Sequence, residues 1–180
     1  GIKVIPCYYK KDYPEWSDRG DGPGAPVAIH LPNSPVIATG KRDGSKIRLP
    51  NGNYLEETAS YYVMVESVTG TYTPALITMK STQLNVSKKW NSMMKTIQIP
   101  DGKGGFAIPP MHGVVYNLSS TLQKNDKGSW YGWVVTMDRI LDQADKTLYL
   151  SAKDFRGNVS KGNVQTKADV EETSSTGTPY

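Results

Sequence analysis

The sequence predicts a mainly β fold with two helices, an OB-like or Greek-key barrel in which one helix lies between strands. Short β-favouring runs alternate with turn-forming clusters, the hydrophobic period changes twice from strand to helix, and the last residues have almost nothing to bury. At 180 residues the chain has room for one well-buried core. We therefore predict one domain over residues 1–162 and a flexible acidic tail over residues 163–180.

The first third of the chain contains four short candidate strands. They are predicted at Ile2–Tyr9, Val36–Thr39, Lys46–Leu49 and Leu55–Glu57. Clusters of Gly, Pro, Asp and Asn separate them, such as Asp18–Gly24. Because these residues favour turns and interrupt the hydrogen-bond ladders of a sheet, each cluster ends a strand.

A β-hairpin is the clearest feature of the next segment. Tyr61–Glu66 and Thr73–Met79 are apolar and rich in β-favouring residues, and the intervening Ser67–Thr71 contains a glycine suited to a short loop.

A helix is predicted directly after this hairpin, because the hydrophobic period becomes helical. Its apolar stripe consists of Val86, Trp90, Met93, Met94 and Ile97. Ser81 or Thr82 would cap its first turn. Lys88, Lys89 and Lys95 lie mainly away from the stripe, so they face solvent or an anionic ligand.

Another strand pair and a second helix complete the predicted domain. The strands are residues 112–120 and Trp130–Met137, joined by the polar turn Gln123–Gly128. The helix would begin at Asp138 or Asp142 and end at Gly157 or Gly162. Its apolar positions are Leu141, Leu148, Ala152, Phe155 and Val159.

Catalytic and metal-binding signatures are missing from the sequence. His30 and His112 have no Cys, Asp or Glu at a metal-ligand spacing, and no nucleophile or nucleotide-binding motif occurs. Cys7, the only cysteine, lies in an apolar segment and is predicted to be a buried structural thiol. An acidic run consists of Asp12, Glu15, Asp18 and Asp21. These carboxylates could hold Mg²⁺ or Ca²⁺, but their glycine-rich setting favours a solvated loop. We expect no enzymatic activity, no cofactor and no metal.

The charge distribution favours an anionic partner. The net charge is +4, and residues 165–180 carry one lysine and three acids, which leaves +6 on the preceding residues. A basic body is typical of nucleic-acid binding, although an ordinary soluble surface accounts for this modest excess about as well. No apolar stretch reaches the length of about 18 residues needed for a membrane helix, so no membrane partner is predicted.

Lysines and aromatic rings interleave in Tyr8–Trp16 and Lys124–Tyr131. In such stretches a lysine can contact a phosphate while a ring stacks on a base. The stacking contributes about 1–3 kcal/mol of binding free energy per base. Interior packing is the alternative role of the aromatic residues. The residues predicted to contact nucleic acid are Tyr9, Lys10, Lys11, Trp16, Lys88, Lys89, Lys124, Lys127, Trp130 and Tyr131.

The stretches Thr73–Trp90 (TPALITMKSTQLNVSKKW) and Lys124–Trp133 (KNDKGSWYGW) resemble a bacteriophage protein family with mostly uncharacterised members. Three shorter stretches are similar too: Val4–Cys7, Glu15–Trp16 and Asn53–Thr58. The resemblance implies an early phage protein located in the host cytoplasm, and it supplies no catalytic residues. The chain is also similar in size and layout to phage OB-fold single-stranded DNA-binding proteins, which often end in an acidic tail with a terminal aromatic residue.

The end of the chain follows that tail pattern loosely, with Asp169, Glu171, Glu172 and Tyr180. The resemblance thus implies that the tail contacts phage replication proteins. The predicted function is single-stranded DNA binding in phage replication or recombination, through a basic groove and aromatic stacking. The alternative is a non-enzymatic virion component or host-directed inhibitor in which the aromatic residues form a protein interface. The sequence does not specify the oligomeric state.

Overall fold

A computed structural model describes residues 1–18, 25–126 and 128–164. Its strands are β1 (Ile2–Trp16), β2 (Ala28–His30), β3 (Lys41–Asp43), β4 (Lys46–Arg48), β5 (Tyr54–Glu56), β6 (Thr58–Glu66), β7 (Tyr72–Lys80), β8 (Ile99–Pro100), β9 (Phe106–Ala107), β10 (Val114–Asn125) and β11 (Gly128–Ile140). Its α-helices are α1 (Pro35–Thr39), α2 (Leu84–Thr96) and α3 (Lys146–Ser160). Three 3-10 turns precede other elements, at Ser81–Gln83, Met111–Gly113 and Gln143–Asp145.

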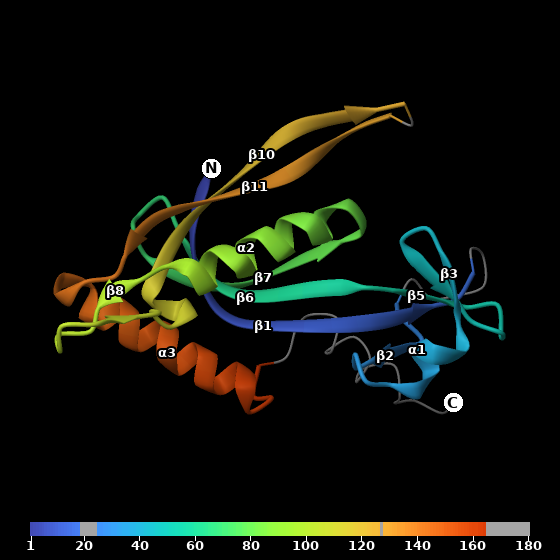
Figure 1. Ribbon diagram of the computed structural model, residues 1–180, viewed down its shortest axis with the longest axis horizontal. Helices are drawn as coiled ribbons and strands as arrows, with labels where there is room; N and C mark the ends of the chain where they lie inside the picture. The colour runs from blue at the N-terminus through green and yellow to red at the C-terminus, as the bar shows by residue number, and fades with distance from the viewer. Residues whose placement is uncertain (19–24, 127, 165–180) are drawn as a thin grey trace, which may run out of the picture.

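Strand β1 organises the main antiparallel sheet. It pairs with β6 along most of its length, with β10 near its beginning, and with β2 and β5 near its end. Strands β7 and β11 extend the sheet beyond β6 and β10. The result is a curled half-barrel, so the predicted mainly β fold with two long helices is confirmed and is consistent with the OB-like class (Figure 1).

A β-bulge in β1 gives the two ends of this strand different neighbours. The register against β6 shifts between Pro6 and Tyr8, and a bulge changes which face of the sheet the following side chains point to. Val4 and Tyr9 therefore contact the core around α2, whereas Cys7 belongs to the cluster beneath α3. Burial raises the pKa of the Cys7 thiol to about 12, which agrees with a structural cysteine.

Helix α2 lies in the curl of the sheet, between the β10–β11 hairpin and strands β6 and β7 (Figure 1). Its Trp90 is fully buried and stacks on Tyr61, with 4.3 Å between the ring centroids. The Tyr61 hydroxyl donates a hydrogen bond to the Ser87 carbonyl and accepts one from the Asn91 amide. These contacts fix the rotation of α2, as the predicted apolar stripe requires.

Helix α3 covers the opposite face of the sheet near the beginning of β1. Its Ala152 is buried against Ile5 and Cys7. The predicted start and stop signals at Asp142 and Gly162 are confirmed: the Ala144 amide donates to Asp142 Oδ1, and Gly162 follows the helix with φ of 74°. The Asp142 cap belongs to a short 3-10 turn that leads into the helix.

A third cluster packs beneath α1 at the end of β1. It contains Tyr13, Ile47, Leu49 and Leu55, with Val36 and Ile37 against them. The prediction of a strand at Val36–Thr39 is wrong. The β-branched residues favour a strand, but Pro35 presets the backbone of a first helical turn, and one turn is enough to place both apolar side chains on this cluster.

The structure corrects three further expectations. Strand β1 continues past Tyr9 to Trp16, and the predicted turn at Gln123–Gly128 is mostly strand because β10 and β11 run to Asn125 and Gly128. Neither Ser81 nor Thr82 is the N-cap of α2. That position is Gln83, without a side-chain bond, because Ser81 and Thr82 belong to a 3-10 turn that leads into the helix. Ser81 has φ of 51°, which differs from the usual N-cap backbone. Residues 165–180 lie outside the described part, so the predicted tail stays a prediction.

Candidate nucleic-acid interface

The structure places the predicted nucleic-acid residues on three surfaces. Strand β1 carries Tyr9, Lys10, Lys11 and Trp16. Helix α2 carries Lys88 and Lys89, and the β10–β11 hairpin carries Lys124, Trp130 and Tyr131. Lys127 lies outside the described residues, as do the tail residues Asp169, Glu171, Glu172 and Tyr180.

Two of the β1 residues are engaged by their neighbours in the fold. The half-buried ring of Tyr9 contacts that of Tyr61, with 5.0 Å between the centroids. Lys11 Nζ lies 2.7 Å from Glu57 Oε1, and this hydrogen bond raises the pKa of Lys11. Both side chains therefore contribute to the fold, and we do not assign them to the interface.

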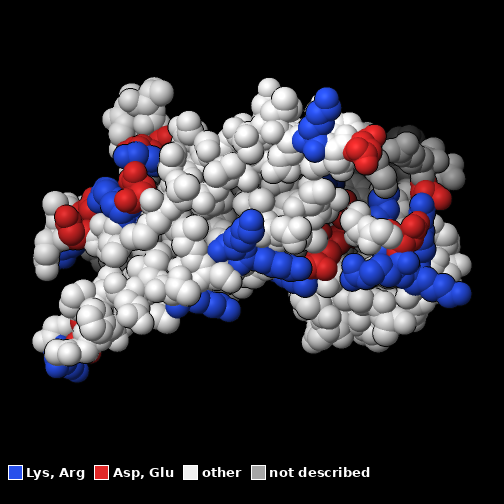
Figure 2. Space-filling model, turned by 45° about the horizontal axis from the view of Figure 1, so that its top comes forward, with Lys and Arg blue, Asp and Glu red and all other residues white. Residues whose placement is uncertain are grey.

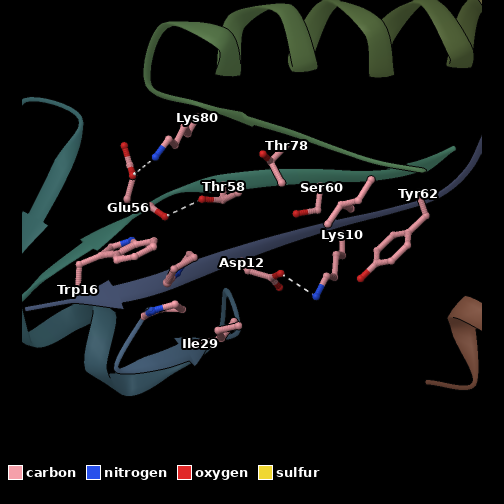
Figure 3. Close-up of a pocket in the computed structure, with 13 residues that line it drawn as sticks. Lys10, Asp12, Trp16, Ile29, Glu56, Thr58, Ser60, Tyr62, Thr78 and Lys80 are labelled. Carbon is pink, nitrogen blue, oxygen red and sulfur yellow. Dashed lines mark hydrogen bonds and ion pairs between the residues drawn. The ribbon is translucent and has the colours of Figure 1, made fainter. Parts of the chain in front are cut away.

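Lys10 and Trp16 line a groove on the face of the sheet opposite α2 (Figure 3). The groove has a volume of about 260 Å³ and crosses β1, β6 and β7. Lys10 forms an ion pair with Asp12, and Lys80 forms one with Glu56, each at 3.0 Å. Because each lysine lies beside a carboxylate, the groove presents little net charge to a polyanion.

Helix α2 presents a different electrostatic surface. Lys88, Lys89 and Lys95 are exposed, and the helix contains no acidic residue. In the part of the chain that the structure describes, none of the three forms an ion pair. Figure 2 shows that basic side chains are dispersed on the side facing the viewer and that toward the right they lie among acidic ones. A polyanion would therefore meet a few separate lysines.

The β10–β11 hairpin carries apolar side chains beyond the end of the core. Leu118 is buried and Trp133 packs beside it against the α2 core. Leu122 and Tyr131 are directly opposite each other nearer the tip, on the same face of the hairpin, and are 60% and 71% exposed. The hairpin projects past α2 as an arm (Figure 1). Leu122 and Tyr131 form an uncovered aliphatic–aromatic pair on it.

Contacts join this arm to the beginning of α2. The Trp133 amide donates a 3.1 Å hydrogen bond to Gln83 Oε1. A shallow cleft of about 210 Å³ separates Trp130 and Ser129 from Thr82. We give the name α2–arm surface to the exposed lysines of α2 together with the exposed side chains on one face of the arm: Lys88, Lys89, Lys95, Leu122, Lys124 and Tyr131. Trp130 points to the other face of the hairpin, because successive side chains of a strand alternate.

A buried polar cluster around Glu15, near the end of β1, was not predicted from the sequence. Glu15 is 7% exposed, so the prediction that this residue lies in a solvated loop is wrong. Its carboxylate accepts hydrogen bonds from Asn53, His30 and Asn51 at 2.6, 2.7 and 3.2 Å, and these bonds, that from Asn53 foremost, lower its pKa. The partners are 15 to 38 residues away, so local spacing could not reveal them.

Residues 1–165 match the family model described as Pam3 phage gp34-like protein. The chain belongs to this family. The resemblance to a bacteriophage protein family is therefore confirmed. The search of curated proteins gives no match, and neither does the search of solved structures.

The described part of this phage-family member contains no group of three or more His, Cys, Asp and Glu residues that could hold a metal ion. Within the same residues, no helix is both long and apolar enough to span a membrane.

Proposed function

We propose that this phage protein binds single-stranded DNA without sequence preference through the α2–arm surface, in phage DNA replication or recombination. The observation that supports it is the position of an exposed aromatic ring, Tyr131, on a surface with four exposed lysines that lack a described ion pair. These lysines are Lys88, Lys89, Lys95 and Lys124.

The two kinds of side chain on this surface have separate roles in the proposal. The lysines neutralise phosphates and release counterions, which supplies affinity for any sequence. Tyr131 stacks on an unpaired base, and a base inside a duplex does not offer its face in this way. Since neither contact reads the edge of a base, the protein discriminates single strands from duplexes but not one sequence from another.

The salt dependence of binding tests the proposal quantitatively. For single strands, log K falls with log salt by about 0.7 per neutralised phosphate, so four lysines predict a slope of roughly −3. The measurement is fluorescence anisotropy of a labelled dT oligonucleotide over a range of salt concentrations, with duplex DNA as competitor. No binding at low salt, or an equal preference for duplex, would refute the proposal.

Matched variants locate the surface. The double variant Lys88→Gln/Lys89→Gln should weaken binding and reduce the magnitude of the slope by about 1.4, since it removes two phosphate contacts. The control Lys153→Gln/Lys161→Gln removes the same charge from exposed positions on α3 and at its C-cap, and it should leave the slope nearly unchanged. An equal loss in both variants would mean that only net charge matters.

A second candidate function is a protein interface in a virion component or a host-directed inhibitor. The observation that favours it is Leu122, which is 60% exposed beside Tyr131 and has no ring to stack on a base. If the arm binds DNA, Tyr131→Ala should reduce affinity for dT far more than Leu122→Ala. If the arm binds a protein, the wild-type chain should show no affinity for dT.

A further inference from the structure

An apolar ridge borders the groove on the sheet face away from α2. Val27, Ile29 and Leu31 are 58%, 53% and 62% exposed at alternating positions in and beside β2. Ile29 is the register partner of Pro14, and both line the groove. We call these three residues the β2 ridge; Figure 3 shows Ile29 at the edge of the groove.

The groove combines apolar side chains with two ion pairs and with the hydroxyl groups of Thr58, Ser60 and Thr78 (Figure 3). Leu76 is 40% exposed on β7, and Tyr62 and Trp16 line the groove from β6 and β1. The Lys10–Asp12 and Lys80–Glu56 pairs lie along it, so its two cations are balanced by two anions. A surface with apolar side chains and balanced charge favours an occupant that is apolar and carries little net charge.

We propose that the occupant is a second copy of this chain, bound about a twofold axis so that each β2 ridge enters the groove of the other copy. The ridge and the groove are adjacent on one face; the ridge is apolar, and the groove offers Trp16, Tyr62 and Leu76 as apolar contacts. A twofold axis through such a face brings each ridge opposite the other groove, which is the self-complementarity that an isologous dimer requires.

Electrostatics supports a second copy on this face. Two identical α2–arm surfaces would repel each other through their lysines, whereas two copies of the groove face present balanced charges. A nucleic-acid occupant is disfavoured because its phosphates would approach the carboxylates of Asp12 and Glu56.

The dimer also leaves the α2–arm surface open. The groove is lined by Thr58, Ser60 and Tyr62 of β6, whereas the intervening Ala59 and Tyr61 belong to the core around α2. Successive side chains of a strand point to opposite faces. The dimer contact and the α2–arm surface therefore use different faces of the sheet, and each copy in the dimer would present one α2–arm surface outward. The dimer proposal thus does not depend on the DNA-binding proposal.

Sedimentation velocity of the full chain from 1 to about 100 µM tests the dimer, because a specific interface typically has a dissociation constant in or below this range. We expect the wild-type protein to be a dimer at the upper end. Ile29→Asp and Leu76→Asp each place a charge in the apolar contact, so each should weaken dimerisation at least tenfold. Both side chains are exposed, and circular dichroism checks that the variants fold.

The matched control is Leu150→Asp, a change at an apolar side chain of α3 that is 45% exposed. It should leave the dimer intact. A wild-type protein that stays monomeric at about 100 µM would overturn the proposal, and so would dimers of unchanged affinity in both groove-face variants. Affinity for dT should persist in Ile29→Asp, so failure of the dimer and failure of DNA binding are distinguished.

Discussion

Replacement of Trp90 tests how α2 is held in the curl of the sheet. The indole is fully buried, stacks on Tyr61 and meets Tyr116 edge to face, with 5.6 Å between the latter centroids. Its Nε1 is also buried and has no hydrogen-bond partner among the described residues. Trp90 therefore combines a large favourable packing contribution with an unfavourable buried donor.

These two contributions give different magnitudes for two substitutions. Burial of about 200 Å² at roughly 25 cal/mol per Å² gives about 5 kcal/mol as an upper value, and measured Trp→Ala changes cost about 3–5 kcal/mol. Trp90→Phe keeps most of the ring contact and removes the unpaired N–H, whose burial costs about 1–3 kcal/mol. We therefore expect a loss of about 4 kcal/mol for Trp90→Ala and of only about 1 kcal/mol for Trp90→Phe.

Urea unfolding followed by far-ultraviolet circular dichroism measures both losses as changes in the free energy of unfolding, with similar m values if the unfolded states are comparable. An equal loss for Phe and Ala would refute the reasoning, because it would mean that the ring contacts retained by Phe contribute nothing to stability. Loss of α2 packing should also reduce DNA affinity in Trp90→Ala if Lys88 and Lys89 bind phosphate.

Three further predictions concern stability, pH and reactivity. Burial, with smaller contributions from Arg156 and Lys153, lowers the pKa of His112. The free energy of unfolding should therefore be full above the ordinary histidine pKa of about 6.5 and fall as the pH drops below it. His112→Phe should flatten this part of the stability–pH profile, and a constant difference from the wild type between pH 5 and 7 would contradict the assignment. Asp142→Ala should cost about 1 kcal/mol through loss of the cap before α3, seen as a lower melting temperature, whereas Asp142→Asn should retain much of it. Cys7, with its pKa raised to about 12, should react with a thiol reagent only upon unfolding; rapid reaction in the native protein would show that the site opens.

Features that depend on neighbouring residues in the chain were predictable. The apolar, β-favouring runs Tyr61–Glu66 and Thr73–Met79 predicted the β6–β7 hairpin, and the stripe through Trp90 predicted α2 and the outward direction of its lysines. Even the Lys10–Asp12 pair is local, since residues two apart share one face of a strand. It was missed because β1 was expected to end at Tyr9.

Features that depend on distant partners were not predictable. Val36–Thr39 has the composition of a strand, but the apolar cluster of β4 and β5 holds Val36 and Ile37 as part of a helical turn. Lys11, like Lys88, belongs to a pair of consecutive lysines in the sequence. Only the pairing of β1 with β6 brings Glu57 to within 2.7 Å of Lys11.

The sequence by itself determined the mainly β character, the periodic helices and the membership of a phage protein family, because local propensity, periodicity and motif similarity need no third dimension. Tertiary structure alone decided which lysines pair with acids of other strands, which aromatic residues are buried and where the groove lies. An ion pair or a buried ring is set by side chains from strands far apart in the chain, and the register of those strands is fixed only when the sheet folds.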